Sequence, residues 1–296
     1  MAFVANAAAV AHGLAKIKQA TEQPVLRVAV LGSSNVRLLR SALESDFSSH
    51  LPERQVETYE VPYGQLRQAL LDPSSELRRW QPHVSIFCDR LEDLLGRARL
   101  DEAVAIPVGE VVEQYAALIS AYAAANQGWT FVHRFALLYR SADKSGGREV
   151  AAMIDQMNSL LESRLAGLNQ VLWVDVAAEA ASDGAPSVDF RLWHLARMPY
   201  SEPFSRWLAR CWTGRVLAVL GKTARAVILD LDNTLWGGVL GEEGMTGVRL
   251  GGDFPGNAFL SFQRVLKALA ERGIALVICS KNDEELALEA IENLPA

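Results

Sequence analysis

Two aspartates, Asp230 and Asp232, stand one residue apart after the apolar run 226–229, in the string AVILDLDNTLWGGVLGEEG. The run is typical of a strand inside a parallel sheet, and ligands of such sheets bind beyond the carboxyl ends of the strands. In extended geometry the two side chains project to the same side. Neighbouring carboxylates repel and need a cation, and Mg²⁺ is suited because it prefers oxygen ligands and often shares them with a phosphate.

These residue types at this spacing indicate phosphoryl transfer. Asp230 can attack a phosphorus atom and form an aspartyl-phosphate. Asp232 can protonate the leaving oxygen and later take a proton from the attacking water. The alternative interpretation is an acidic turn that caps the next element, because paired aspartates also cap helices and bind water.

The string DLDNT after an apolar run resembles the first motif of the haloacid dehalogenase (HAD) phosphohydrolase superfamily, DxDx[T/V]. The resemblance implies that Asp230 is the nucleophile and that Asp232 is the general acid/base, whose main-chain carbonyl also meets Mg²⁺. It implies that Thr234 supports the loop. The second motif of the superfamily is a strand that ends in Ser or Thr and binds the phosphoryl group. IALVICSKN (274–282) fits this pattern, with Ser280 in that place.

Three longer strings carry a narrower resemblance, to the FkbH family: LDLDNTLWGGVLGEEG (229–244), LWHLARMPYSEPF (192–204) and VICSKND (277–283). In this family a HAD-type domain follows an N-terminal domain of SGNH-hydrolase-like fold. The resemblance implies a Mg²⁺-dependent enzyme of polyketide biosynthesis. Such an enzyme takes the glyceryl group of 1,3-bisphosphoglycerate, removes its phosphate and loads the group on an acyl carrier protein, with an enzyme cysteine as thioester carrier.

Cys279 is the candidate for that cysteine, because it directly precedes Ser280 at a strand end beside the expected metal site. Proximity to Mg²⁺ or to Lys281 would lower the pKa of its thiol. The opposite interpretation is a buried, inert cysteine, since adjacent residues of a strand point to opposite faces. Cys88 ends another apolar run and Cys211 lies within a predicted helix, so we expect both to be packing residues.

Apolar runs that alternate with helical periodicity must position these groups. The predicted strands are 25–32, 56–64, 84–88, 129–139 and 171–176, and the strongest helices are 109–127 and 149–168. The alternation predicts an α/β fold with a doubly wound parallel sheet of SGNH- or flavodoxin-like type. A helix over 201–221, with Ser201 as its N-cap, precedes a second alternation. We therefore expect an N-terminal domain with linker helix at 1–221 and part of a HAD-like, Rossmann-type domain at 222–296.

The string VAVLGSSNVRLL predicts a strand, a tight turn and a helix, which places Ser33 or Ser34 where an SGNH hydrolase carries its nucleophile. Asp189 and His194 are spaced more widely than the DxxH pattern of such hydrolases, and the usual Gly and Asn blocks are not evident. We therefore expect no esterase activity. In this interpretation Ser34 or Asn35 caps the helix and His194 packs on an aromatic surface.

Tryptophans gather in two places. Around the linker stand Trp193, Trp207 and Trp212, at a helical spacing that favours packing between the domains over a ligand box. Trp236 follows the aspartates and is a candidate wall of the pocket or of its flap. Gly237 and Gly238 would let that flap approach a ligand closely.

Composition excludes several classes of function. The net charge is -6 with both signs interspersed, so no nucleic-acid footprint is expected. Three scattered cysteines predict neither a zinc site nor a disulfide framework, which favours a reducing cytoplasm. The Ala-rich stretch 1–24 is expected to be an amphipathic helix or a frayed tail rather than a signal peptide. No apolar run reaches the ~18 residues that a membrane span needs.

The HAD resemblance also implies a lysine that neutralises the phosphoryl charge and a further acidic strand end that completes the Mg²⁺ shell. Neither follows Ser280 in these 296 residues, and Lys281 stands too close to Ser280 for that role. We therefore expect a partial domain, weak Mg²⁺ affinity and little turnover by this chain alone. The alternatives to glyceryl transfer are a small-molecule HAD phosphatase and a non-catalytic, SGNH-like module that docks a carrier protein.

Overall fold

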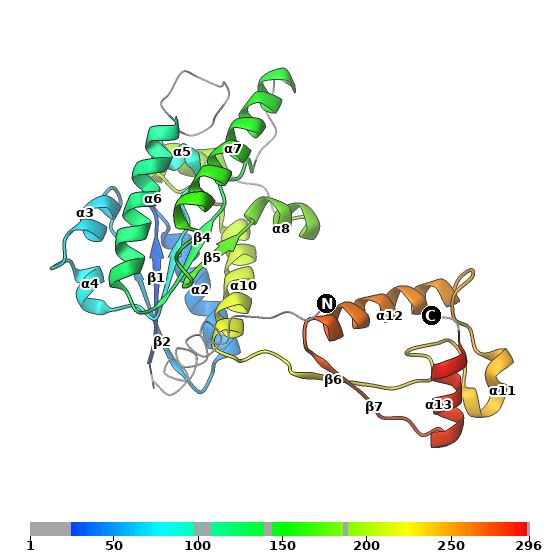
Figure 1. The fold of residues 1–296 in the computed structure, drawn as a ribbon. Coiled ribbons are helices and arrows are strands. Elements are labelled where there is room, and N and C mark those ends of the chain that lie inside the picture. Colours follow the sequence, from blue (N-terminus) through cyan, green and yellow to red (C-terminus); the bar gives the residue numbers. More distant parts are fainter. Residues whose placement is uncertain (1–24, 98–99, 101–107, 139–143, 186–188, 295–296) are drawn as a thin grey trace. The chain divides into compact units, whose positions relative to one another are not determined.

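The computed structural model describes residues 25–97, 100, 108–138, 144–185 and 189–294 (Figure 1). The chain divides into two compact units, Met1–Gly221 and Lys222–Ala296. The helix or tail expected over 1–24 lies outside the described residues. No helix within the described ranges is long and apolar enough to cross a membrane.

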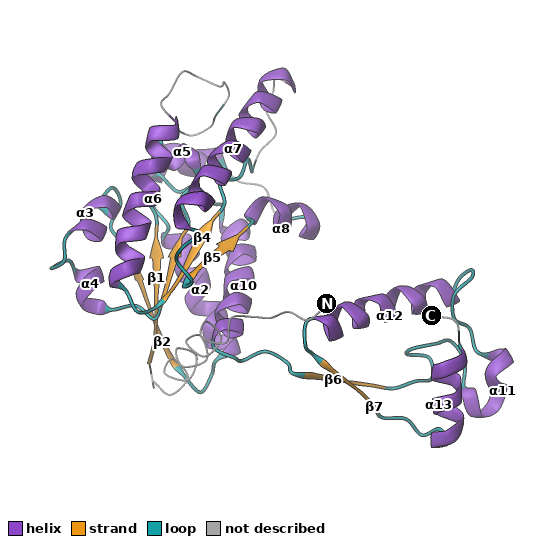
Figure 2. Ribbon diagram, in the orientation of Figure 1, coloured by secondary structure: helices purple, strands orange, loops and turns teal. Residues whose placement is uncertain are grey.

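The first unit is built on a five-stranded sheet in the order β2-β1-β3-β4-β5 (Figure 2). Every neighbouring pair in it is parallel. Its strands are β1 Val25–Leu31, β2 Gln55–Glu60, β3 Val84–Phe87, β4 Trp129–His133 and β5 Val171–Val174. This is the strand order of a doubly wound, flavodoxin-like sheet. The α/β class and the parallel sheet predicted from the sequence are confirmed.

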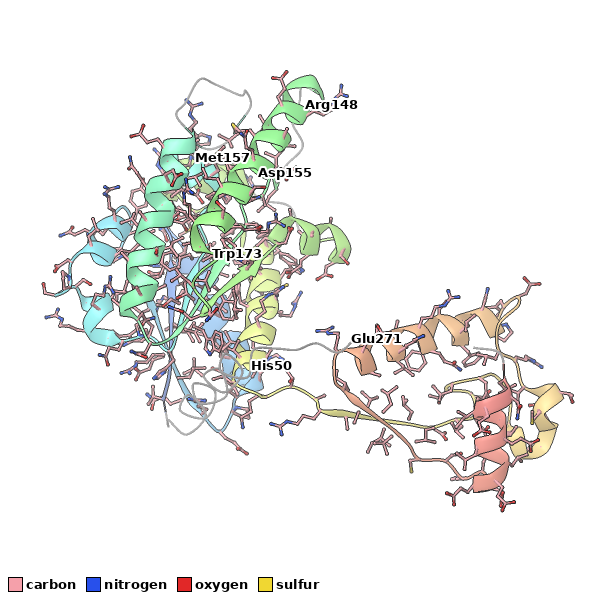
Figure 3. All side chains as sticks on the ribbon, viewed as in Figure 1. His50, Arg148, Asp155, Met157, Trp173 and Glu271 are labelled. Carbon is pink, nitrogen blue, oxygen red and sulfur yellow. The ribbon has the colours of Figure 1, made fainter. Side chains whose placement is uncertain are left out.

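Helices cover both faces of this sheet. They are α2 Arg37–His50, α3 Leu66–Leu71, α4 Glu76–Trp80, α5 Leu91–Leu94, α6 Val108–Ala125, α7 Lys144–Leu165, α8 Val176–Asp183, α9 Phe190–Ala196 and α10 Glu202–Val219. Side chains of β1 alternate between two cores, because successive residues of a strand face opposite sides. Ala29 and Leu31 belong to the core under α6 and α7, and Val28 belongs to the core under α2 and α10. Met157 on α7 and Trp173 on β5 lie in the first of these cores (Figure 3).

Helix α10 begins as the sequence predicts, because the Ser201 hydroxyl accepts a main-chain N–H of the first turn at 3.3 Å. The helix packs along α2, and Trp207 and Trp212 are buried in the core between them and the sheet. Trp193 is also buried within this unit, with the guanidinium of Arg90 5.4 Å from its ring centroid. The expectation that these tryptophans pack between domains is therefore wrong, because the apolar face of α10 completes the first unit's own core.

Strand β4 ends at His133, although its apolar run predicts a strand to residue 139. Just beyond it, the side chain of Asn158 on α7 accepts the N–H of Phe135 at 2.7 Å and donates to the carbonyl of Phe135 at 2.9 Å. The side-chain amide of Asn158 thus replaces the neighbouring strand as hydrogen-bond partner, so both main-chain groups of Phe135 stay paired where the chain leaves the sheet.

The second unit is smaller. Its elements are β6 Ala226–Leu229, α11 Leu240–Gly247, α12 Gly256–Glu271, β7 Ala275–Ile278 and α13 Glu284–Asn293. Strands β6 and β7 pair in parallel, and Glu271 marks the last residue of α12 in Figure 3. A compact core joins the loop after β6 to α11 and α13; its buried members are Leu231, Trp236, Leu240, Ala287 and Ala290.

The expectation that β6 lies inside a sheet is wrong for the described chain. Only Leu229 of β6 is buried, and all four residues of β7 are exposed. Each strand has only the other as its partner in the described residues. The exposure of most of their residues shows that neither face of the pair is fully covered. An apolar cavity of about 360 Å³ opens beside the strands, lined among others by Leu266, Leu276 and Ile291.

Candidate active site

The ends of β6 and β7 lie at the same edge of the small sheet. Leu229 pairs with Ile278 in the parallel register, and the N–H of Cys279 donates to the carbonyl of Leu229 at 2.8 Å. The residues that follow, Asp230 on one strand and Ser280 on the other, therefore leave the sheet from neighbouring positions. This is the edge at which ligands of parallel sheets bind.

Asp232 is held by hydrogen bonds to both carboxylate oxygens. Its Oδ1 accepts from the indole Nε1 of Trp236 and from the main-chain N–H of Leu240, each at 3.1 Å. Its Oδ2 accepts from the side-chain Nδ2 of Asn282 at 2.9 Å. Donors from three different segments therefore fix the orientation of this carboxylate.

These contacts determine the charge state of Asp232. Partial burial by itself raises the pKa of the carboxyl, but the hydrogen bonds from Leu240, Asn282 and Trp236 more than offset it, so the pKa lies below its ordinary value. Hydrogen bonds to the ionised form stabilise it. In the site without substrate, Asp232 is therefore a carboxylate, ready to accept a proton.

Asp230 has a different environment. It is exposed, and its Oδ1 accepts the N–H of Leu231 at 2.8 Å, while no described residue hydrogen-bonds to its Oδ2. The premise that Asp230 and Asp232 belong to one extended strand is wrong. Strand β6 ends at Leu229, and the carbonyl of Leu231 accepts from Thr234 at 3.2 Å and from Leu235 at 2.8 Å, which closes a turn. The turn therefore separates the accessible carboxylate of Asp230 from that of Asp232, which three hydrogen bonds hold in place.

The donor set for a divalent cation is small. Among the described residues, no three His, Cys, Asp or Glu side chains gather closely enough to hold a metal ion. The carboxylate of Asp232 is occupied by N–H donors, so the chain would bind Mg²⁺ through the carboxylate of Asp230 and the main-chain carbonyl of Asp232. Both are hard oxygen ligands, and Mg²⁺ commonly takes one or two carboxylates together with water and substrate phosphate. The residues present fit this ion.

Ser280 lies at the other strand end, half-buried. Its Oγ accepts from the main-chain N–H of Asn282 at 3.2 Å and from the Nδ2 of Asn282 at 3.1 Å. Asn282 therefore links Ser280 to Asp232, although sequence reasoning assigned it no role. The signal was faint: an asparagine two residues after Ser280, in the loop beyond a strand end.

Of the remaining predicted residues, one supports the turn after β6 and two are exposed. Thr234 lies in the turn after β6, where its N–H helps to close the turn. Cys279 is exposed, as are all four residues of β7, so the interpretation that it faces a core is wrong. Lys281 is also exposed, and no described carboxylate pairs with it.

Trp236 and the glycines after it have a packing role that sequence reasoning did not assign. The indole is buried, lines the apolar cavity and donates to Asp232. A Cβ on Gly237 would lie 2.8 Å from the ring of Phe259, so this glycine permits close approach of α12 rather than of a ligand. Gly238 has φ +104, a conformation that side chains rarely adopt.

Ser33 and Ser34 make no hydrogen bond to a histidine among the described residues. Ser33 donates through its N–H at 2.5 Å and its hydroxyl at 3.4 Å to the two oxygens of Asp89. The Oγ of Ser34 is buried without a hydrogen-bond partner among the described residues. His194 is exposed rather than packed on an aromatic surface, and Asp189 instead caps α9. The carboxyl ends of β1 and β3 therefore hold Ser33 and Asp89 together, and no histidine of the described residues hydrogen-bonds to either.

Asn35 rather than Ser34 accepts a main-chain N–H of the first turn of α2, that of Arg37 at 3.2 Å. Cys88 and Cys211 are packing residues of the core under α2 and α10, as predicted. Burial raises the pKa of both thiols, to about 11 for Cys211. Neither is therefore a thiolate near neutral pH.

Asp89 is itself buried, with only 2% of its surface exposed. Burial and, after it, the charge of Asp93 raise the pKa of Asp89 to about 7, although hydrogen bonds from Ser33 and Tyr115 lower it. The carboxyl is therefore half-protonated near neutral pH, where an ordinary aspartate is fully ionised.

We expect Asp89→Asn to remove a pH dependence from the stability of the first unit. The pKa of Asp89 is about 7 in the folded unit and about 3.9 in an unfolded chain. The folded wild type binds the proton of Asp89 more tightly than the unfolded chain does, so protonation of Asp89 stabilises the folded unit. This stabilisation is complete below pH ~4, decreases between pH ~4 and ~7, and is lost once the pH has risen through ~7. Relative to the variant, the wild type should lose up to about 1.4 kcal/mol of unfolding free energy per pH unit in that window. Urea denaturation at several pH values measures the difference, and parallel curves for the two proteins would contradict the assignment.

The chain is similar to a solved structure across both units. The N-terminal part of the protein BF1531 from Bacteroides fragilis, described as containing a phosphatase domain complexed with Mg, is 25% identical with a TM-score of 0.75. The likeness covers 95% of this chain and 77% of that one. The α/β architecture of both units is therefore shared with a protein that contains a phosphatase domain.

Two further solved structures are less similar. A putative GDSL-like lipase from Parabacteroides merdae is 14% identical with a TM-score of 0.45, over 67% of this chain and 96% of that one. The acetylxylan esterase Axe2 from Geobacillus stearothermophilus is 12% identical with a TM-score of 0.42, over 67% and 94%. No protein-family model matches the sequence. No curated protein matches it either.

Proposed function

We propose that this chain carries a Mg²⁺-dependent phosphatase site of HAD type at the carboxyl ends of β6 and β7. One observation carries the proposal: hydrogen bonds through Asn282 join Asp232 to Ser280 across a separation of about fifty residues in sequence. Two strand-end motifs that are remote in sequence therefore share one site. The likeness to the Mg-complexed phosphatase-containing structure supports the same function.

The side chains divide the chemistry between them. An oxygen of Asp230 attacks the phosphorus, the bond from phosphorus to the leaving oxygen breaks, and an aspartyl-phosphate forms. Water then attacks that phosphorus, Asp232 takes the proton of the water, and phosphate leaves with Asp230 restored. Bound Mg²⁺ would neutralise phosphate charge in both steps.

The ionised state of Asp232 suggests which substrates react most readily. A carboxylate cannot protonate a leaving group, whereas it is already prepared to take a proton from water. An acyl phosphate needs no such protonation, because its leaving group is a stable carboxylate. Acetyl phosphate is therefore the preferred probe of this site.

The finer proposal is the reaction that the FkbH resemblance implies. The thiolate of Cys279 would attack the acyl carbon of 1,3-bisphosphoglycerate, the bond to the acyl-phosphate oxygen would break and phosphate would leave, so that a thioester forms. The HAD site would remove the other phosphate, and a carrier-protein thiol would then take the glyceryl group. The exposure of Cys279 next to Ser280 supports this assignment.

Intact-mass spectrometry tests the finer proposal. The chain is incubated with 1,3-bisphosphoglycerate and Mg²⁺, with and without an acyl carrier protein. Glyceryl transfer predicts an adduct that moves to the carrier. Phosphate release without any adduct indicates a small-molecule phosphatase, and carrier association without turnover indicates a docking module.

We expect Cys279→Ala to abolish the adduct while phosphate release from acetyl phosphate persists, because the thiol and Asp230 act in different steps. Cys211→Ala is the matched control, since burial raises the pKa of Cys211 to about 11 and keeps that thiol protonated. Peptide mapping of the trapped thioester locates the modified residue. An adduct that survives in the Cys279→Ala variant would assign the acyl carrier role to another residue.

A further inference from the structure

We propose that Asn282 is a positioning residue of this site, which orients the Ser280 hydroxyl as a hydrogen-bond donor toward the phosphoryl group and holds Asp232 in place. The inference rests on the proposed phosphatase function. It adds a residue whose role follows from the hydrogen bonds that it makes and from no sequence motif.

The orientation of the Asn282 amide follows from its partner. A carboxylate accepts hydrogen bonds and donates none, so the amide atom 2.9 Å from Asp232 Oδ2 is the nitrogen. That nitrogen carries two hydrogens, and the second is directed to Ser280 Oγ at 3.1 Å. Both donors of one amide are therefore used inside the site.

The Ser280 hydroxyl can act only as a hydrogen-bond donor to a ligand. A hydroxyl has two acceptor lone pairs and one hydrogen. The lone pairs of Ser280 receive the main-chain N–H and the Nδ2 of Asn282, at 3.2 and 3.1 Å. No described residue accepts the remaining hydrogen. Asn282 therefore makes Ser280 a donor, which is the polarity that an anionic phosphoryl oxygen requires.

The same amide restrains Asp232. Trp236, in the loop after β6, and Leu240, at the start of α11, hold Oδ1, and Asn282 holds Oδ2 from the loop after β7. Without Asn282 the carboxylate loses its only described link to the second strand end. Preorganised groups of this kind contribute to catalysis because they need not reorganise during the reaction.

Side-chain chemistry at position 282 gives a sharp test. Asn282→Ala removes both donors, and Asn282→Asp keeps the shape but faces Asp232 with a second carboxylate. Ser280→Ala and the double variant Ser280→Ala/Asn282→Ala complete a cycle. Asn257→Ala is the matched control, because Asn257 is exposed in the first turn of α12 and its side chain makes no hydrogen bond among the described residues.

The readouts are kcat and KM for radiolabelled acetyl phosphate, and the inhibition constant of inorganic phosphate, all with Mg²⁺. We expect Asn282→Ala to lower kcat/KM by roughly 10²-fold and to weaken phosphate inhibition, as loss of an oriented donor does. The double variant should lose less than the sum of the two single losses, because part of the effect of Asn282 acts through the same hydroxyl and the rest through Asp232. Asn282→Asp should lose more than Asn282→Ala, and Asn257→Ala should match the wild type.

Additive losses in the cycle would overturn the proposal, as would an Asn282→Asp variant as active as the wild type. If Asn282→Ala does not fold, Asn282→Asp is compared with Asn257→Ala in the same assays, since its shape preserves the packing. A wild type that releases no phosphate, even in the radiolabelled assay, refutes the proposed phosphatase and this inference together. Wild-type turnover with unaltered Asn282 variants refutes this inference alone.

Discussion

Asp230→Asn is expected to abolish Mg²⁺-dependent release of phosphate from acetyl phosphate. The amide is nearly the same size as the carboxylate, so the fold is retained, but it neither attacks phosphorus nor supplies an anionic ligand to the cation. Loss of a covalent nucleophile lowers kcat by roughly 10⁴–10⁶-fold in enzymes where it has been removed. The measurement is release of radiolabelled phosphate by the variant and the wild type, with Mg²⁺ and with a chelator.

The matched control for this change is Asp253→Asn. Asp253 is an exposed carboxylate of the same unit whose side chain has no hydrogen-bond partner in the described residues. Its variant should keep wild-type turnover. Equal activity of Asp230→Asn and the wild type would show that Asp230 is not the nucleophile, and activity in the chelator would remove the Mg²⁺ requirement.

Arg90→Met should have the largest effect on the stability of the first unit. Arg90 is 4% exposed and makes a two-point contact with Asp93, with Nη2–Oδ1 at 2.7 Å and Nε–Oδ2 at 3.2 Å. Burial alone would lower the pKa of Arg90, but the charge and hydrogen bonds of Asp93 more than offset this and raise it. Arg90 is therefore a guanidinium cation.

Methionine fills much of the arginine volume but leaves Asp93 buried without its cation, close to Asp89. Breaking a buried ion pair from one side costs about 3–5 kcal/mol, because the remaining charge stays desolvated. The melting midpoint of this unit should fall by roughly 6–20 °C. Thermal unfolding followed by the tryptophan fluorescence measures the shift.

Two variants separate the charge effect from lost packing. Arg90→Met/Asp93→Asn should recover much of the stability. Asp93 accepts the main-chain N–H of residue 90 at 3.0 Å, and the neutral amide of Asn can still accept it. Arg164→Met removes an equally well-formed pair with Glu113, in which the two side chains are 54% and 42% exposed. Its midpoint should hardly change, because water solvates the remaining charge. Equal losses from the buried and the exposed pair would contradict the role of desolvation.

The two strand ends that form the site were predictable because each depends on a local sequence pattern. An apolar run followed by Asp230, and a second followed by Ser280, gave two strand ends and the class of chemistry. Ser201 predicted the start of α10 for the same reason, since an N-cap depends on residues a few positions apart. The parallel sheet also followed from the alternation of strand and helix, because parallel strands need a crossover between them.

Contacts between distant segments were not predictable in this way. The extended geometry assumed for 230–232 is replaced by a turn. Trp236, a candidate wall of the pocket or of its flap, is also a buried donor to Asp232. The exposure of β7 likewise depends on which elements pack against it and not on its apolar residues alone. The sequence pattern records how apolar a segment is, but burial depends on what packs against it.

The sequence by itself determined the strand ends, their carboxylate and hydroxyl groups, and the α/β class. Only the tertiary structure decided that Asn282 joins Asp232 to Ser280 and that Arg90 lies buried between Asp93 and Trp193. The physical reason is the range of the interactions. Strand and cap preferences act over a few neighbouring residues, whereas the bond from Asn282 to Asp232 forms only when folding brings remote segments within about 3 Å of one another. The Arg90–Asp93 pair is local in sequence, but it is buried only because remote segments pack around it.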